Sequence, residues 1–161
     1  MIKYYLVSRI SEEYHKKHMK LVDMIEGEPF IPHLNNPYNL RHDKLSVGVF
    51  NMDYDAMKES DFGIVSLPIG EDCSSEIGWY AGNSKPIYCI IRTMQEYDNI
   101  KTIWMVKGFL TECIVINDLY LYNFIKENDL ILNNKLRFEI LKNGEKINFH
   151  HKVHGKITSG F

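Results

Sequence analysis

Residues 61–91 read DFGIVSLPIGEDCSSEIGWYAGNSKPIYCII, and this stretch indicates the fold class most clearly. The apolar run at 62–67 is typical of a strand buried on both faces, and residues 86–91 predict another such strand. Between the two runs lie a polar loop and a helix expected from about 74 to 81. A strand, a helix and a second buried strand indicate a right-handed β-α-β unit, and therefore a parallel sheet.

The same alternation continues on both sides of this unit. Further strands are expected at 4–8, 30–31, 101–106 and 112–116. Further helices are expected at 11–26, from Gly48 to about 60, and at 119–127. Residues 136–141 and 146–151 alternate around Asn143–Gly144, which predicts a C-terminal β-hairpin. We expect one domain, residues 1–161, with a three-layer α/β fold: a flavodoxin- or Rossmann-like parallel sheet, helices on both faces, and the appended hairpin.

Composition limits the possible functions. The 161 residues include 19 basic and 21 acidic side chains, a net charge of -2, which argues against binding to polymeric nucleic acid. The three cysteines, Cys73, Cys89 and Cys113, form no C-x-x-C pair and fit reduced thiols in a cytoplasmic protein. The N-terminal apolar run is short for a signal peptide, and no run approaches the roughly 20 apolar residues of a membrane span.

Ligands of open parallel sheets bind beyond the carboxyl ends of the strands. Three segments of this chain are expected at that edge: 8–9, 32–33 and 68–76. The third contains Glu71, Asp72 and Glu76 around the start of a helix. These carboxylates can cap the helix and complement its dipole, or one of them can be a nucleophile facing the ligand. Spacing alone leaves both interpretations open.

Several elements in this region resemble one enzyme family in order and spacing. They are Tyr5-Leu6-Val7-Ser8 in the first strand, Ser60-Asp61, Leu67-Pro68-Ile69-Gly70, Glu76-Ile77-Gly78 and Ser84-Lys85-Pro86. With them, roughly the first 92 residues resemble the nucleoside 2-deoxyribosyltransferases and their relatives, the deoxynucleoside 5'-monophosphate N-hydrolases. The resemblance implies a nucleoside deoxyribosyltransferase-like domain that works as a homo-oligomer, a dimer or larger.

The resemblance also implies roles for individual residues. Glu76 stands at the position of the nucleophile, and Tyr5 where a tyrosine hydroxyl orients it. Asp53 or Asp55 stands near a substrate-binding aspartate. Asp72 can serve the leaving base, although its spacing to Glu76 is shorter than in the transferases.

Helical spacing favours Asp53 over Asp55 as the substrate-binding residue. Val49, Phe50, Asp53 and Met57 share one stripe of the predicted helix, which places the Asp53 carboxylate among apolar side chains expected to face inward. A buried carboxylate needs a partner, and a ligand is one candidate.

Hydroxyls and a guanidinium at the ligand edge raise a nucleotide alternative. Ser8, Arg9 and Ser74 could bind a 5'-phosphate, with Gly70 and His33 beside them, although His33 can equally be a plain loop residue. His150, His151 and His154 lack a carboxylate or cysteine partner, so no metal is expected, and the chemistry requires no cofactor.

The sequence therefore predicts a nucleoside 2-deoxyribosyltransferase acting on a deoxynucleoside and a free nucleobase. The alternatives are a 2'-deoxynucleoside 5'-monophosphate N-hydrolase, with a deoxynucleotide as substrate, and a nucleotide sensor without turnover. We expect a cytoplasmic protein without membrane attachment.

Overall fold

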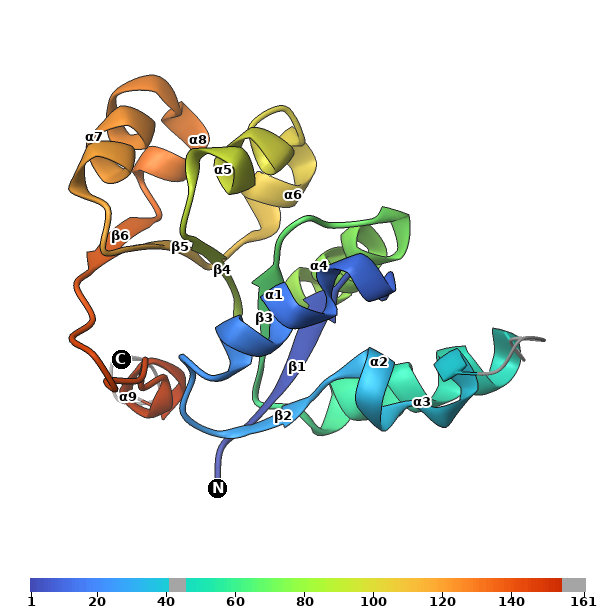
Figure 1. Cartoon of the computed structure of the whole chain (residues 1–161). Coiled ribbons are helices and arrows are strands. Elements are labelled where there is room, and N and C mark those ends of the chain that lie inside the picture. Colours follow the sequence, from blue (N-terminus) through green and yellow to red (C-terminus); the bar gives the residue numbers. More distant parts are fainter. Residues whose placement is uncertain (41–45, 155–161) are drawn as a thin grey trace, which may run out of the picture.

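The computed structural model describes residues 1–40 and 46–154, which form one six-stranded, wholly parallel sheet (Figure 1). The strand order is β2-β1-β3-β4-β5-β6. The strands are β1 (Lys3–Ser8), β2 (Glu28–Phe30), β3 (Phe62–Ser66), β4 (Ile87–Ile91), β5 (Glu112–Ile116) and β6 (Leu136–Glu139). Because β2 and β3 pair with opposite edges of β1, the sheet order reverses between β1 and β3, where open α/β sheets bind ligands. The predicted α/β class is confirmed.

Helices cover both faces of the sheet, as predicted. They are α1 (Glu12–Val22), α2 (Pro32–Asn35), α3 (Ser46–Glu59), α4 (Glu71–Gly82), α5 (Met94–Ile100), α6 (Trp104–Phe109), α7 (Leu119–Asn128), α8 (Leu130–Asn133) and α9 (His150–His154), with a 3₁₀ turn η1 (Pro37–Leu40). No helix in the described part of the chain is long and apolar enough to cross a membrane.

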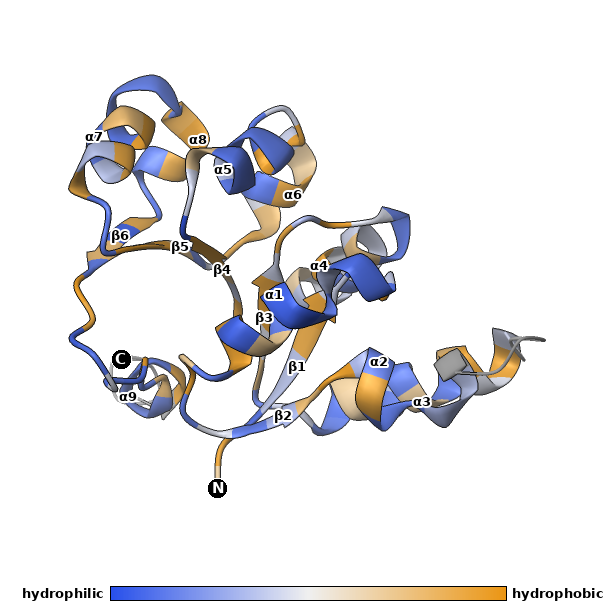
Figure 2. Ribbon diagram, viewed as in Figure 1, coloured by the Kyte–Doolittle hydropathy of each residue, from blue (hydrophilic) through white to orange (hydrophobic). Residues whose placement is uncertain are grey.

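Alternate residues along the strands belong to two separate hydrophobic cores, one on each face of the sheet. Tyr5, Val7 and Val65 pack with residues of α3 to α8 on one face, whereas Tyr4 and Leu6 pack with α1 and the C-terminal segment on the other. In Figure 2 the central strands contain orange, hydrophobic stretches, although part of β1 is pale blue, and the helices carry both orange and blue residues. Burial on both faces explains why these strands read as unbroken apolar runs.

The turn between α4 and β4 ties α3 to the sheet. Ser84 has a positive φ of 56°, and the Lys85 ammonium group donates to the carbonyls of Met57, Lys58 and Ser60 at the end of α3. Lysine near a helix C-terminus satisfies carbonyls that have no partner inside the helix. The conformation of α3, which borders the cavity described below, therefore depends on a turn more than 20 residues away in sequence.

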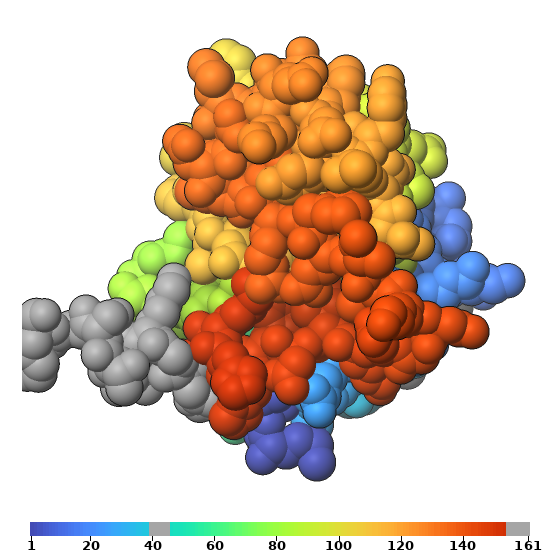
Figure 3. All heavy atoms as spheres, turned by 90° about the vertical axis from the view of Figure 1, so that its left-hand side faces the viewer, coloured from blue at the N-terminus to red at the C-terminus, as the bar shows by residue number. Residues whose placement is uncertain are grey.

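The predicted C-terminal β-hairpin is wrong. Residues Leu136–Glu139 form β6, a parallel edge strand beside β5. Asn143–Gly144 does make a turn, with φ of 84° at Gly144, but the next residues return to the other side of the molecule. There Ile147 forms a single parallel bridge with Ile25, and its side chain is buried together with that of Phe149. Figure 3 shows this C-terminal segment, in orange-red and red, spread over one face of the molecule. Burying two large apolar side chains outweighs a two-stranded pairing at an exposed edge.

The strand predicted at 101–106 is also wrong. Trp104–Phe109 forms helix α6, in which Val106 is buried, as is Leu110 four residues later. Spacing of i, i+4 belongs to a helix, and the short apolar run concealed it. Helix α4 begins at Glu71 rather than at Ser74, so Glu71 and Asp72 occupy its first turn.

Candidate functional site

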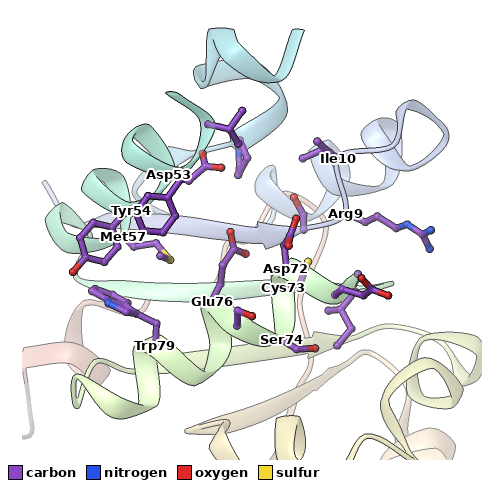
Figure 4. A pocket seen from close by; sticks show the side chains of 18 of the residues that line it. Arg9, Ile10, Asp53, Tyr54, Met57, Asp72, Cys73, Ser74, Glu76 and Trp79 are labelled. Carbon is purple, nitrogen blue, oxygen red and sulfur yellow. The ribbon is translucent and has the colours of Figure 1, made fainter. Parts of the chain in front are cut away.

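A cavity of about 1170 Å³ opens at the carboxyl ends of β1 and β3. It is lined by residues 8–11, by Pro32, by residues 46, 49, 50, 53, 54 and 57 of α3, by residues 69–76 and 79 of the β3–α4 region, and by Ile103. Figure 4 shows the carboxylates of Asp53, Asp72 and Glu76 directed into the same space. The volume suits a small organic ligand.

Tyr5 and Glu76 meet beside this cavity. The Tyr5 hydroxyl donates to Glu76 Oε1 at 2.7 Å, joining the middle of β1 to the second turn of α4. The Tyr5 ring is fully buried and stacks on Phe30, with ring centroids 5.6 Å apart and planes 9° from parallel. Burial and the charge of Glu76 raise the pKa of Tyr5 well above its ordinary value, so its hydroxyl keeps its proton and remains a donor.

Glu76 has no cationic partner among residues 1–40 and 46–154. Burial raises its pKa to about 8, against the Tyr5 hydrogen bond, and the charges of Asp53 and Asp72 add to the rise. A carboxyl group held in this way changes its protonation state near neutral pH, as catalytic carboxyl groups do.

Asp53 lines the cavity from α3 and has a protein partner that the sequence did not indicate. The Asn36 side chain donates to Asp53 Oδ1 at 2.8 Å. Burial raises the pKa of Asp53, the Asn36 hydrogen bond opposes that rise, and the charge of Asp72 reinforces it. Asp55, the alternative, is exposed and pairs with Lys58 at 2.6 Å outside the cavity lining.

Asp72 and Gly70 lie at the mouth of the cavity, at the start of α4. Asp72 is exposed, and Gly70 has an extended backbone at the N-cap position of the helix. Asn99 fixes the preceding loop by accepting from the Ile69 amide at 3.1 Å. An acceptor from α5 thus holds the loop that leads into the start of α4, where Asp72 lies.

The hydroxyl groups predicted to bind substrate line the cavity at the end of β1 and near the start of α4. Ser8 is buried at the end of β1, and its Oγ has no hydrogen-bond partner in the described chain. Ser74 also lines the cavity. Arg9 lies at the rim, but its side chain extends away from the carboxylates in Figure 4, with its guanidinium 5.8 Å from the Tyr14 ring centroid.

The histidines near this edge of the sheet contact other parts of the protein and do not line the cavity. His33 is buried but does not line the cavity; its ring stacks on that of His15, with centroids 3.8 Å apart. His18 is within 2.6 Å of Ser66 Oγ and donates from Nε2 to the Arg9 carbonyl at 2.9 Å. Because a carbonyl can only accept, neutral His18 accepts from Ser66 through Nδ1. It thereby joins the ends of β1 and β3.

Cys73 is poorly suited to nucleophilic chemistry. Burial and the charge of Glu76 raise the pKa of its thiol to about 12, so the thiolate is scarce at neutral pH. Nor does any group of three or more His, Cys, Asp or Glu side chains in the described ranges have the arrangement of a metal site.

Three aromatic side chains at one end of the cavity were not predicted as site residues. Phe50 stacks on Tyr54 with centroids 5.4 Å apart, and Tyr54 meets Trp79 edge-on at 5.7 Å. Phe50 was expected to face inward, but it is 62% exposed, because only the Asp53–Met57 side of α3 meets the sheet. The i, i+4 pair Phe50–Tyr54, on a helix predicted to carry a ligand-binding aspartate, was the available signal.

The structure is similar to that of a known deoxyribosyltransferase. It resembles a 2-deoxyribosyltransferase from the psychrotolerant bacterium Bacillus psychrosaccharolyticus. The two chains are 18% identical, with a TM-score of 0.48, over 69% of this chain and 84% of the other. No protein-family model matches this chain, and no curated protein matches it.

Asp53, Asp72 and Glu76 line the cavity together with Ser8, Arg9, Gly70 and Ser74, and Tyr5 is joined to this group by its hydrogen bond to Glu76. Of the predicted site residues, Tyr5 and His33 are not part of the lining. Asn36 and the three aromatic side chains are additions to the predicted site residues.

Proposed function

We propose that this protein is a nucleoside 2-deoxyribosyltransferase that cleaves the N-glycosidic bond of a 2'-deoxynucleoside and transfers the sugar to another base. The observation that carries the proposal is the Glu76 carboxyl group, hydrogen-bonded to Tyr5 at 2.7 Å and directed into a cavity large enough for a nucleoside. A carboxylate with no cation beside it is available to attack an electrophilic carbon.

In the proposed reaction, Glu76 attacks C1' of the deoxyribose. The bond between C1' and the base nitrogen breaks, its electron pair goes to the base, and a covalent deoxyribosyl ester of Glu76 remains. A second base then attacks C1' from the face that the first base left, which releases Glu76 and retains the configuration. Tyr5 orients the carboxylate by donating to one of its oxygens while the other attacks.

The departing base needs a proton, which Asp53 supplies. Burial raises the pKa of Asp53, so this half-buried group retains a proton to higher pH than an exposed aspartate would. Asp72 is exposed at the mouth of the cavity, where it can contact the base.

The raised pKa of Glu76 gives the proposal a definite pH dependence. The attacking form is the carboxylate, which in the free protein becomes the major form only above a pH of about 8. We therefore expect kcat/KM to rise between pH 6 and pH 8. A fall over the same range would instead identify Glu76 as a proton donor.

The two ends of the cavity support a nucleoside as ligand. Phe50, Tyr54 and Trp79 offer aromatic surfaces for a base, and stacking of one base on an aromatic side chain contributes about 1–3 kcal/mol. At the opposite end, Ser8 Oγ is a buried donor with no partner in the described chain, and it suits an oxygen of the sugar.

That same hydroxyl favours one second candidate, hydrolysis of a deoxynucleoside 5'-monophosphate. Ser8 and Ser74 could donate to a phosphate near the start of α4. However, Glu71 and Asp72 carry negative charge in the first turn of this helix, and Arg9 extends away from the carboxylates. Repulsion from these carboxylates makes the uncharged nucleoside the better ligand.

Incubation with deoxyinosine and free adenine tests the proposal. Formation of deoxyadenosine supports transfer, whereas release of hypoxanthine without exchange indicates hydrolysis. Separate incubation with each deoxynucleoside monophosphate tests the second candidate, and binding without turnover indicates a sensor. Mass spectrometry should detect a deoxyribosyl adduct on the peptide that contains Glu76. Glu76→Ala should lose both turnover and adduct while keeping its fold, and undiminished activity in this variant would refute the assignment.

A further inference from the structure

Asn36 joins three parts of the chain beside the cavity without lining it. The side chain is fully buried between α2 and α3. Its amide nitrogen donates to Asp53 Oδ1 at 2.8 Å and to the Val49 carbonyl at 3.1 Å, and its oxygen accepts from the Tyr38 amide at 3.1 Å. Both hydrogens of the amide group are thus used, so the orientation of the side chain is defined.

The hydrogen bond from Asn36 distinguishes the two oxygens of Asp53. Oδ1 is engaged by Asn36, whereas Oδ2 has no hydrogen-bond partner in the described ranges, and Asp53 lines the cavity. The donor is a neutral amide, and no cation of residues 1–40 or 46–154 pairs with Asp53. A neutral donor orients a carboxylate and favours its charged form without cancelling the charge.

We propose that Asn36 is a positioning residue that holds the carboxyl group of Asp53 in one orientation, with Oδ1 fixed and Oδ2 presented to the ligand. This inference rests on the proposed function, since it takes Asp53 as a ligand-binding group. Its consequence, however, can be measured in the free protein.

The consequence concerns the charges that face one another across the cavity. Asp72 and Glu76 of α4 and Tyr5 of β1 are the titratable groups that interact with Asp53. The hydrogen bond from Asn36 lowers the pKa of Asp53 against the larger effect of burial, and the charge of Asp53 raises the pKa of Glu76. Without Asn36, Asp53 should hold its proton to higher pH, and Glu76 should then lose its own proton at lower pH.

Titration of the carboxyl groups by ¹³C NMR in the ligand-free protein tests this linkage. In Asn36→Leu, the midpoint of Asp53 should rise by about one pH unit, and that of Glu76 should fall by a smaller amount. Asn35→Leu is the matched control: Asn35 is exposed and accepts from the Ile31 amide, so its loss loosens α2 without touching Asp53. Both midpoints should stay in place in the control.

A measurement on the unaltered protein keeps the test independent of any folding defect in Asn36→Leu. The side-chain amide resonances of Asn36 should move with the ionisation of Asp53. Resonances that do not respond to pH, or an unchanged Asp53 midpoint in folded Asn36→Leu, would overturn the proposal. Failure of base exchange would overturn only the proposed function, because the titration uses no substrate.

Discussion

Carboxylates in two regions of this molecule, buried in one and half-buried in the other, have opposite surroundings. In the α5–α8 region, Asp129 accepts from Lys107 at 2.7 Å, from the Tyr97 hydroxyl at 3.1 Å and from two amides of α8. Likewise, Glu96 is bound by Arg92 and Lys17. At the cavity, Glu76 and Asp53 have only neutral donors, the Tyr5 hydroxyl and the Asn36 amide.

The difference appears in the proton affinity of the carboxyl groups. Burial by itself would raise the pKa of Asp129, yet the hydrogen bond from Lys107 and the other donors hold it below its ordinary value. Glu76 is raised to about 8 because no cation offsets burial. The paired carboxylates serve the fold, whereas the unpaired ones reduce its stability and fit a role in chemistry.

The largest expected effect is on turnover in Glu76→Gln. This change keeps the shape and the Tyr5 contact but removes the proposed nucleophile, so kcat/KM should fall by about a thousandfold or more. Glu96→Gln should do the reverse, lowering stability while the remaining folded protein keeps its rate per molecule. Steady-state base exchange together with thermal unfolding checks both variants. Equal loss of turnover in the two would remove the distinction between the regions.

Breaking the ion pair of the other region should affect stability instead. Asp129→Asn leaves the buried Lys107 ammonium without a counter-charge and should lower the free energy of unfolding by about 3 kcal/mol. Urea unfolding at pH 7 measures the change. A double variant, Lys107→Met with Asp129→Asn, should recover part of the loss because no unpaired charge remains. A single variant as stable as the wild type would contradict the structural role.

The unpaired Glu76 should make stability depend on pH in a definite direction. Its folded pKa of about 8 lies above the ordinary 4.5, so the folded state binds the proton more tightly than the unfolded state. The wild type should therefore lose stability as the pH rises from 4.5 to 8. Glu76→Gln should avoid this loss and be more stable than the wild type by about 4–5 kcal/mol at pH 9.

Denaturant unfolding at pH 5 and pH 9 measures this difference. At pH 5 the wild type and Glu76→Gln should be nearly equal, because Glu76 is then protonated in the folded state. A difference of the same size at both pH values would show that the effect is not ionisation.

The smallest expected effect follows from removing one hydroxyl. Tyr5→Phe loses the donor that lowers the pKa of Glu76, so the rise of kcat/KM should move up by about one pH unit, with roughly a tenfold loss at pH 7. Tyr4→Phe is the matched control, since Tyr4 is equally buried on the opposite face of the sheet and its hydroxyl has no hydrogen-bond partner in the described residues. Its pH profile should match that of the wild type.

Short-range pattern was enough to predict most of the sheet and part of the site. Apolar runs at 4–8, 62–67, 86–91 and 112–116 became central strands, because a strand covered on both faces must be apolar throughout. The carboxyl ends of parallel strands share one edge, so the segments that contain Ser8 and Glu76 were expected together there, and they line one cavity.

Tertiary packing alone determined the rest. The C-terminal residues 146–149 carry strand-like alternation, yet Ile147 and Phe149 are buried in the second core instead of pairing in a hairpin. Whether a polar side chain finds a partner is likewise a long-range outcome: Asn36 reaches Asp53 across 17 positions, and Tyr5 reaches Glu76 across 71. The sequence thus determined which residues could bear charge at the ligand edge. The protonation state of these carboxyl groups was decided by how deeply each is buried and by whether the fold places a cation beside it. Both depend on contacts between distant parts of the chain.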